Sequence, residues 1–568
     1  MTPAPALTAG TGGPAATGSD RASMIAPHVA RGGRKSFAVA APSLFELAMA
    51  LILGLGLVFA FVGLAASSYD IDELFTLHVI DHRGGLAEVT RRTLDHTGPP
   101  LYYGLLFEWS KLAGLSEAAL RLPSAVFATG AVMLFALGAG APFSRPARLS
   151  AAAVAVCGRF WMIQSQLALG YALALLVSAG LVVLALALRR RVQEGRSPWP
   201  IWASLTLLSL AGAMVHFYLA LEAGLVMGFL VLTTGPLRLK GALLGAGLAC
   251  VAVTATYGAV LLNHTQEDIE HMRLGGGSGF LVRQALLALR DAYGPLSAVA
   301  MIAVIATAVA RVRKGLREGV PVKALIGPDL QWSAGLAAFV LVGMAVLGVA
   351  ASLAVAPSFS GRGLLVAAPM AWLLTAVAFE LRGFRRQAPQ HPALMLVMAL
   401  VLGVSQAQQL QGRFLPRGEE WRASARYVDE TKTCQGRPIP VLEPPRYGPP
   451  TPYFIRLDQA AFYGRYAASP QRLVPFAMAD VAAGRPDLAA LWKERLGADA
   501  SHCPILAAQV HGLSPGQAED LRRAIASAVG APDDRVVLRS FPNFRLKLFG
   551  WRPQAGAYIY LARHAGSG

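Results

Sequence analysis

Long apolar runs separated by short polar connections fill the chain up to about residue 410. Because a helix needs about 20 apolar residues to cross the hydrocarbon core of a bilayer, this pattern predicts a polytopic α-helical membrane protein. Eleven segments qualify as transmembrane helices: 44–66, 119–141, 149–166, 171–188, 199–217, 219–236, 241–262, 295–312, 331–355, 364–381 and 391–410.

The connections between these segments alternate in charge. Every second one is basic, and Lys and Arg concentrate on the cytoplasmic side of membrane proteins. We therefore predict that the N-terminus lies inside and the C-terminus outside. The 1–42 tail, rich in Ala, Pro, Gly, Thr and Ser, is expected to be a disordered cytoplasmic segment. The basic connections lie at 145–148, 189–196, 238–240, 311–323 and 382–386.

Two long connections then fall on the outer side, at 67–117 and 263–295, and complete a membrane domain over 43–410. The first holds Pro99–Gly114, whose aromatic residues suit a helix lying in the membrane interface. The second holds the glycine run Gly275–Gly279, which has little conformational preference and is expected to act as a hinge.

The pattern changes after residue 411, where long apolar runs stop. Alternating strand and helix signals predict a small exported α/β domain over 411–568. In an exported domain, Cys434 and Cys503 are expected to form a disulfide, whereas Cys157 and Cys250 lie in apolar runs as inert packing residues. The expected strands are Ile439–Leu442, an edge strand because of Pro440, Ile505–Val510, Val536–Ser540 and Ala557–Leu561, and the expected helix is Pro515–Val529.

Composition agrees with the membrane assignment. The chain is 54% hydrophobic and 15% charged, with a mean hydropathy of +0.47. The net charge of +18 would suit nucleic acid, but the cations sit in the short loops, so no nucleic-acid partner is expected. Phosphate-binding, dinucleotide-binding and nucleophile-elbow motifs are not found in the sequence, so we expect no nucleotide cofactor.

Three carboxylates directly follow the first apolar run, at Asp70, Asp72 and Glu73. Charged groups next to hydrocarbon are costly, so they usually face a polar cavity and function there. One interpretation is a general base for a hydroxyl, or a ligand for a metal ion. The other is local: Asp70 and Glu73 have the spacing of a capping box at a helix N-terminus. Both interpretations can hold together.

Histidines gather on the predicted outer side. There, His78, Asp81 and His82 share one helical face and, with Asp70 or Glu73, are candidate ligands for a divalent cation; a solvated polar face is the alternative. Another outer cation, Arg362, is a candidate phosphate clamp, with a snorkelling interfacial anchor as the alternative. The six outer histidines are His78, His82, His96, His216, His264 and His271.

The order of these motifs resembles the GT-C glycosyltransferases, specifically the bacterial relatives of the dolichyl-phosphate-mannose protein mannosyltransferases and of the lipid A aminoarabinose transferase. The matching segments cover about the first 220 residues. They are Asp72–Thr76, His96–Tyr103, Leu120–Ser124, Ser165–Gln166 with Tyr171, and His216–Tyr218.

The resemblance implies transfer of a sugar from a polyprenyl-phosphate carrier to a glycan, lipid or protein of the cell envelope, on the periplasmic face of the bacterial inner membrane and with inversion. It makes Asp72 the general base, with Glu73 supporting it or touching a metal. The candidate metal ligands are Glu73, His78 and His82. The candidate substrate contacts are Asp70, His96, Tyr102, Tyr103, Gln166, Tyr171, His216, Tyr218 and Arg362.

Three departures from the family pattern accompany the resemblance. The segment Ser165–Tyr171 has lost a Glu and an Arg, His96 is displaced by two positions from the Pro-Pro pair, and Gly363 stands where Tyr often follows the arginine. The lost Glu and Arg keep a non-catalytic envelope scaffold as an alternative, and a transporter of lipid-linked glycans is another. A transporter would show repeated halves with polar groups at the membrane midplane, and these are not evident in the sequence.

Overall fold

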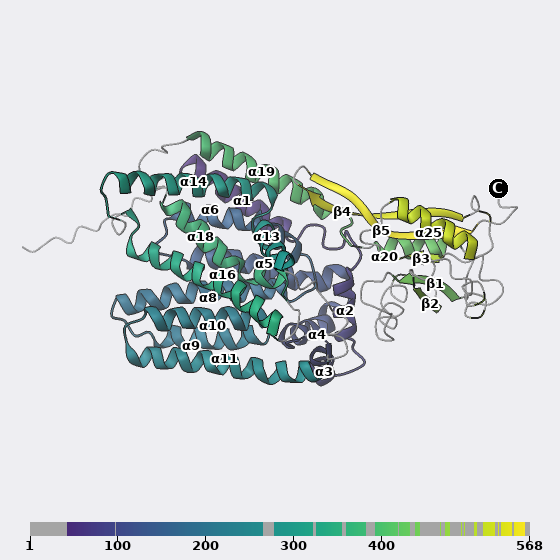
Figure 1. Cartoon of the computed structure of the whole chain (residues 1–568), viewed down its shortest axis with the longest axis horizontal. Helices are drawn as coiled ribbons and strands as arrows, with labels where there is room; N and C mark the ends of the chain where they lie inside the picture. Colours follow the sequence, from purple (N-terminus) through teal and green to yellow (C-terminus); the bar gives the residue numbers. More distant parts are fainter. Residues whose placement is uncertain are drawn as a thin grey trace, which may run out of the picture. The chain divides into compact units, whose positions relative to one another are not determined.

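The computed structural model describes residues 42–562 except 97, 265–277, 322–324, 355–358, 382–391, 419, 432–437, 444–465, 467–471, 478–489, 491–493, 495–504, 508–514, 529–531, 533–535 and 548–549. Contacts divide the chain into two units, Met1–Pro42 and Ser43–Gly568. All elements described below belong to the second unit, and Figure 1 labels them where there is room. The predicted tail, the centre of the glycine hinge, His271 and both C-terminal cysteines lie outside the described residues.

Helices make up nearly all of the described chain before residue 432. They are α1 (Leu44–Phe59), α2 (Ile71–Val79), α3 (Leu86–His96), α4 (Leu101–Ala113), α5 (Glu117–Gly138), α6 (Arg145–Val156), α7 (Arg159–Gln164), α8 (Tyr171–Gln193), α9 (Trp199–Ala213), α10 (Phe217–Thr233), α11 (Leu237–His264), α13 (Ser278–Tyr293), α14 (Pro295–Arg317), α16 (Pro328–Ala354), α17 (Gly361–Leu364), the 3-10 turn η1 (Leu365–Ala367), α18 (Ala368–Leu381), α19 (Pro392–Arg413) and α20 (Trp421–Thr431).

Most of the predicted spans are present as helices. Seven described segments are long and apolar enough to cross a membrane: Glu117–Gly138, Tyr171–Gln193, Leu237–Ala259, Pro295–Arg317, Pro328–Ala351, Gly361–Leu381 and Ala393–Arg413. Three further predicted spans correspond to the shorter apolar helices α1, α9 and α10. Helices α8, α9, α10 and α11 pack side by side (Figure 1).

The predicted span 149–166 is not one helix. It is divided into α6 and α7, and Gly158 caps the second of them. A Cβ atom on Gly158 would lie 2.5 Å from the carbonyl oxygen of Ala292 in α13. The break therefore occurs where another backbone approaches too closely for any side chain, which hydropathy does not reveal.

The core lies where helices distant in sequence meet. Helix α18 packs against α6, α8, α14 and α16, and 12 of its 14 residues are buried. The predicted outer connection 67–117 contains α2, α3 and α4. The expected interfacial helix is present as α4, but its Tyr102 and Phe107 are only 1% and 2% exposed because α4 packs against α3 and α5.

A five-stranded mixed sheet follows the helices, in the order β2-β1-β3-β5-β4. Strands β1, β2 and β3 are parallel, and β5 is antiparallel to both β3 and β4. The elements are β1 (Pro438–Glu443), β2 (Arg472–Ala477), β3 (Ile505–Ala507), α25 (Pro515–Ala528), β4 (Val536–Lys547) and β5 (Gly550–Ala562).

Four strands and the helix of this part match the sequence prediction, whereas β2 was missed. The prediction that β1 is an edge strand is wrong, because β1 lies between β2 and β3. The ladder to β3 begins only at Val441, so Pro440 stands beyond it. The edge strand on this side is β2, and it carries Pro475, which agrees with the confinement of proline to edge strands.

Candidate functional site

The three predicted carboxylates lie at the start of α2. Asp70 is the N-cap residue, and its side chain accepts a hydrogen bond from the backbone N–H of Asp72 at 3.1 Å. The Asp70 N–H in turn donates to the Glu73 carboxylate at 2.9 Å. This reciprocal pair is a capping box, so the local interpretation of the sequence is confirmed. It fixes the direction in which the chain enters α2.

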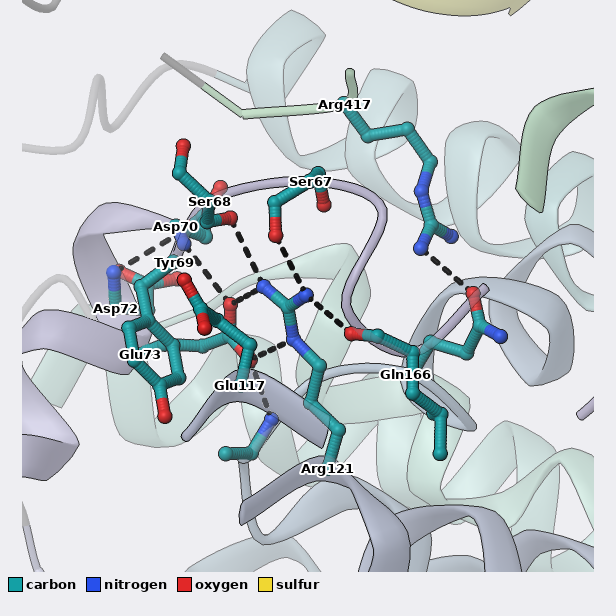
Figure 2. A network of polar contacts seen from close by, with 12 residues as sticks. Ser67, Ser68, Tyr69, Asp70, Asp72, Glu73, Glu117, Arg121, Gln166 and Arg417 are labelled. Atoms are coloured by element: carbon teal, nitrogen blue, oxygen red, sulfur yellow. Dashed lines mark hydrogen bonds and ion pairs between the residues drawn. The ribbon is translucent and has the colours of Figure 1, made fainter. Parts of the chain in front are cut away.

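Glu73 lies inside the protein, paired with Arg121 of α5 (Figure 2). The guanidinium donates to both Glu73 oxygens, at 2.8 and 2.6 Å, and the two side chains are only 0% and 1% exposed. The backbone N–H of Ala168 donates to the same carboxylate at 2.8 Å. Because both oxygens are engaged, the structure places Glu73 as a buried anchor and not as a group that faces a substrate or metal.

Arg121 also holds the loop before α2. Its remaining donors bind the carbonyl oxygens of Leu64, Ser67 and Ser68 at 2.8, 2.9 and 2.9 Å. Figure 2 shows the guanidinium next to Ser67, Ser68 and Glu73. A planar cation with five donors suits such a set of acceptors. One buried arginine thus ties the end of α1 to the start of α2.

The pKa of Asp70 is raised in the folded chain. Its withdrawal from water, and then the negative charges of Asp72 and Glu73, raise the pKa of Asp70 to about 7, although the Asp72 amide and Arg362 oppose the shift. A group with this pKa exchanges protons near neutral pH, which general acid–base chemistry requires. The sequence predicted Asp70 as a substrate contact, as a candidate base or metal ligand and as a helix cap, and it did not indicate which of the three carboxylates has a raised pKa.

Asp72 forms an ion pair with Arg362, a residue 290 positions later in α17. The distance between the Asp72 Oδ2 and Arg362 Nη1 atoms is 2.9 Å, and the two side chains are 46% and 64% exposed. Helix α17 is held in place by Ser360, which caps it, and by the Gly361 N–H, which donates to Gln284 of α13. The pair is therefore accessible while its backbone is fixed.

Three aromatic residues of the predicted site lie together beside this pair. The ring of His216 is 5.3 Å from that of Tyr171 and 5.9 Å from that of Tyr218. Tyr171 is close enough to both Asp72 and Arg362 for their charges to interact with its hydroxyl group. These residues stand at the N-terminal ends of α8 and α10, so the structure brings Asp72, Arg362 and these aromatic residues into one region.

The departure at Gly363 has a structural reason in the same region. A Cβ atom on Gly363 would overlap the ring of Tyr218. Tyr218 of α10 therefore fills the space that a side chain at position 363 would need.

Other predicted contacts lie in the interior. Gln166 is fully buried; its amide donates to the carbonyl oxygens of Ala60 and Val62, and its Oε1 accepts from Arg417 at 2.7 Å. Tyr102 is buried with its hydroxyl 3.5 Å from that of Ser124, and the half-buried Tyr103 packs on it. These side chains support the region from within.

The histidines that follow the three carboxylates in sequence, His78 and His82, do not form a cluster with them. His82 lies 2.7 Å from the Ser110 hydroxyl, and His78 is exposed. Within the part of the chain that the structure describes, no three His, Cys, Asp or Glu side chains gather as a metal site. The predicted ligand set of Glu73, His78 and His82 therefore does not fit a divalent cation, since Glu73 is occupied by Arg121.

Two predictions concern residues of which little is described. His96 ends α3 and His264 ends α11, and the side chains of both lie outside the description. Cys434 and Cys503 also lie outside it, whereas Cys157 and Cys250 are free and buried, as the sequence indicated.

The sequence analysis missed the arginines that hold the region together. Besides Arg121, the fully buried Arg413 donates to the Met162 carbonyl at 2.9 Å and lies within 3.4 Å of the Ser165 hydroxyl. Arg417 reaches Gln166. An arginine inside an apolar run is a visible signal, because such a charge must find a partner, and Arg121 in Leu120–Ser124 has this pattern.

No protein-family model and no curated protein matches the sequence. Solved structures do match. The apo form of ArnT from Cupriavidus metallidurans has 12% identity and a TM-score of 0.50, over 90% of this chain and 97% of that chain. The same protein bound to undecaprenyl phosphate has 13% identity and a TM-score of 0.47, over 91% and 98%.

A third match is the archaeal oligosaccharyltransferase AglB from Archaeoglobus fulgidus, in complex with an inhibitory peptide and a dolichol-phosphate, with 11% identity and a TM-score of 0.42 over 90% of this chain and 75% of that chain. The apo ArnT match shows that the chain shares the fold of that protein. The GT-C fold expected from the sequence resemblance is thereby confirmed.

Proposed function

We propose that this chain is a membrane glycosyltransferase that moves a sugar from a polyprenyl-phosphate carrier to a hydroxyl of a cell-envelope glycan, lipid or protein. In this proposal Asp72 is the general base and Arg362 binds the donor phosphate. The transfer takes place on the periplasmic face of the inner membrane.

The observation that supports this most is the exposed ion pair between Asp72 and Arg362. A carboxylate and a guanidinium from distant parts of the chain meet at one end of several apolar helices, beside Tyr171 and Tyr218. Because the two side chains are 46% and 64% exposed, the pair contributes little to stability. Its value lies in supplying a proton acceptor and a phosphate-binding cation at neighbouring positions.

The proposed reaction begins when the donor phosphate replaces the Asp72 carboxylate as the anion bound to Arg362. A donor phosphate binds the Arg362 guanidinium, for which paired hydrogen bonds to phosphate oxygens are favourable, and releases the Asp72 carboxylate. The acceptor hydroxyl then loses its proton to Asp72 while its oxygen forms a bond to the anomeric carbon. The bond from that carbon to the phosphate oxygen breaks, and the carrier leaves as a polyprenyl phosphate whose charge faces Arg362.

The fold and the resemblance support the same reaction class. The chain shares the fold of ArnT, and its motif order resembles bacterial transferases that use lipid-linked sugars. A donor with a polyprenyl tail stays in the bilayer, with its phosphate at the headgroup level, so the enzyme mainly orients the two reactants. We propose no metal ion in this step.

The test is transfer from a panel of polyprenyl-phospho-sugars by the purified chain in lipid nanodiscs. Asp72→Asn should lower kcat by at least about 100-fold while donor binding is kept, since Arg362 remains. Asp81→Asn is the matched control, because Asp81 is an acidic residue of the same connection that pairs with Arg83. Full activity of the Asp72→Asn chain would remove the proposed base.

A further inference from the structure

The loop that leads into α2, residues 64–70, is called the acidic loop here. Residues from the part of the chain that follows α19 pack against it. The N–H of Tyr69 donates to the Tyr466 hydroxyl at 3.0 Å, and that hydroxyl donates to the Glu117 carboxylate at 2.7 Å. Arg422 of α20 also binds Glu117, at 2.6 Å, and the Ala65 carbonyl, at 3.1 Å. These bonds join residues about 300 to 400 positions apart.

Residues at and just before the start of α20 contact the same loop. The N–H of Trp421 donates to the Ser68 hydroxyl at 3.1 Å, and Ser68 is only 1% exposed. Gly418 lies so close that a Cβ atom on it would be 3.6 Å from the Asp70 Cα atom. Between them Glu420 has a φ of 39°, the one positive φ outside glycine among the described residues. Such a backbone persists only where its surroundings hold it.

The loop is thus held from two sides. Arg121 binds its carbonyl oxygens from within the helical part, and Tyr466 with Arg422 binds it from outside. We propose that Tyr466 and Arg422, here called the clamp, are positioning residues: they hold residues 65–70 so that Asp70 stays half-buried beside Asp72. The role of the clamp in sugar transfer rests on the proposed function. The contacts that form the clamp are independent of that proposal.

The clamp acts on Asp70 through solvent access. The charged groups that face Asp70 are Asp72 and Glu73 of α2, Arg362 of α17 and Arg417, which lies ahead of α20. None of these is removed when the clamp is broken. Loss of the Tyr466 hydroxyl therefore admits water to the loop without changing the neighbouring charges, and Asp70 should become more acidic.

The experiment uses the full chain in nanodiscs, with Tyr466→Phe and Glu117→Gln as test variants. Tyr427→Phe is the matched control, since Tyr427 is a tyrosine of α20 that packs on Phe541 of β4. Hydrogen exchange of the peptide spanning 64–71 reports the Tyr69 amide. Carbodiimide labelling of Asp70, read by peptide mass spectrometry across pH 4–9, reports its protonation without any substrate.

We expect both test variants to speed exchange of the Tyr69 amide about fivefold and to lower the pH of half-labelling of Asp70 by about one unit. The control should keep the parent's values. Unchanged exchange in both variants would overturn the clamp, and faster exchange with an unchanged labelling profile would overturn its positioning role. If the parent transfers no sugar, the proposed function fails, while these two measurements still decide the clamp.

Discussion

Arg121→Met is the substitution that most directly tests how the acidic loop is built. The side chain makes five hydrogen bonds: two to Glu73 and three to the carbonyl oxygens of Leu64, Ser67 and Ser68. Its removal leaves a buried carboxylate with backbone N–H donors alone, together with three carbonyl groups that lose a partner. Breaking a buried ion pair in this way costs about 3–5 kcal/mol.

The assay is reversible unfolding of the purified chain in mixed micelles with increasing denaturing detergent, and the quantity is the free energy of unfolding. Arg91→Met is the control. Arg91 pairs with Glu88 on the surface of α3 and is 60% exposed, so its loss should cost less than about 1 kcal/mol.

A double substitution separates the lost pair from lost packing. In Glu73→Met with Arg121→Met the uncompensated charge is gone, so the double variant should be more stable than Arg121→Met by about 1–3 kcal/mol. The Glu73→Met single variant completes the comparison. The anchoring role of Arg121 would be refuted if Arg121→Met lowered the free energy of unfolding by less than about 1 kcal/mol. It would also be refuted if the decrease in the double variant equalled the sum of the decreases in the two single variants.

The remaining predictions concern two neighbours of this loop. Because the native pKa of Asp70 is about 7 and its ordinary value is 3.8, the native chain keeps a proton there that the unfolded chain has released. Its contribution to stability is therefore full below about pH 4 and is lost as the pH rises through 7. Asp70→Asn, which keeps a good N-cap, should flatten this slope in pH-dependent unfolding, and an unchanged slope would contradict the raised pKa. Gly363→Ala should destabilise the chain by about 1–3 kcal/mol through overlap with the Tyr218 ring. Tyr218→Ala in the same chain should relieve that part of the loss, and thermal unfolding in nanodiscs measures both variants.

The spans were predictable because a membrane imposes one simple rule. A helix must be apolar over about 20 residues to cross it, and among the described residues seven segments meet that requirement in both sequence and structure. The capping box at Asp70 was predictable for a similar reason, since its two partners are three residues apart. Strands β1, β3, β4 and β5 and helix α25 follow local patterns of the same kind, whereas β2 did not show one.

The position of each carboxylate was not predictable in this way. Asp70, Asp72 and Glu73 are neighbours in sequence with the same chemistry, yet they differ in exposure and partner. Arg121 forms an ion pair with Glu73, 48 positions away in sequence, and Arg362 forms one with Asp72, 290 positions away. No periodicity or spacing encodes such pairings.

The same limit explains the errors in the fold. A predicted span is divided at Gly158, where the Ala292 backbone comes close, and Pro440 precedes the first residue of β1 that pairs with β3. The sequence by itself determined which segments are helical, which are apolar enough to span a membrane, and where acidic and basic residues follow them. The tertiary structure decided which carboxylate is buried, which titrates near neutral pH and which meets a cation at the surface. Those properties depend on solvent access and on distances between residues that only folding brings together.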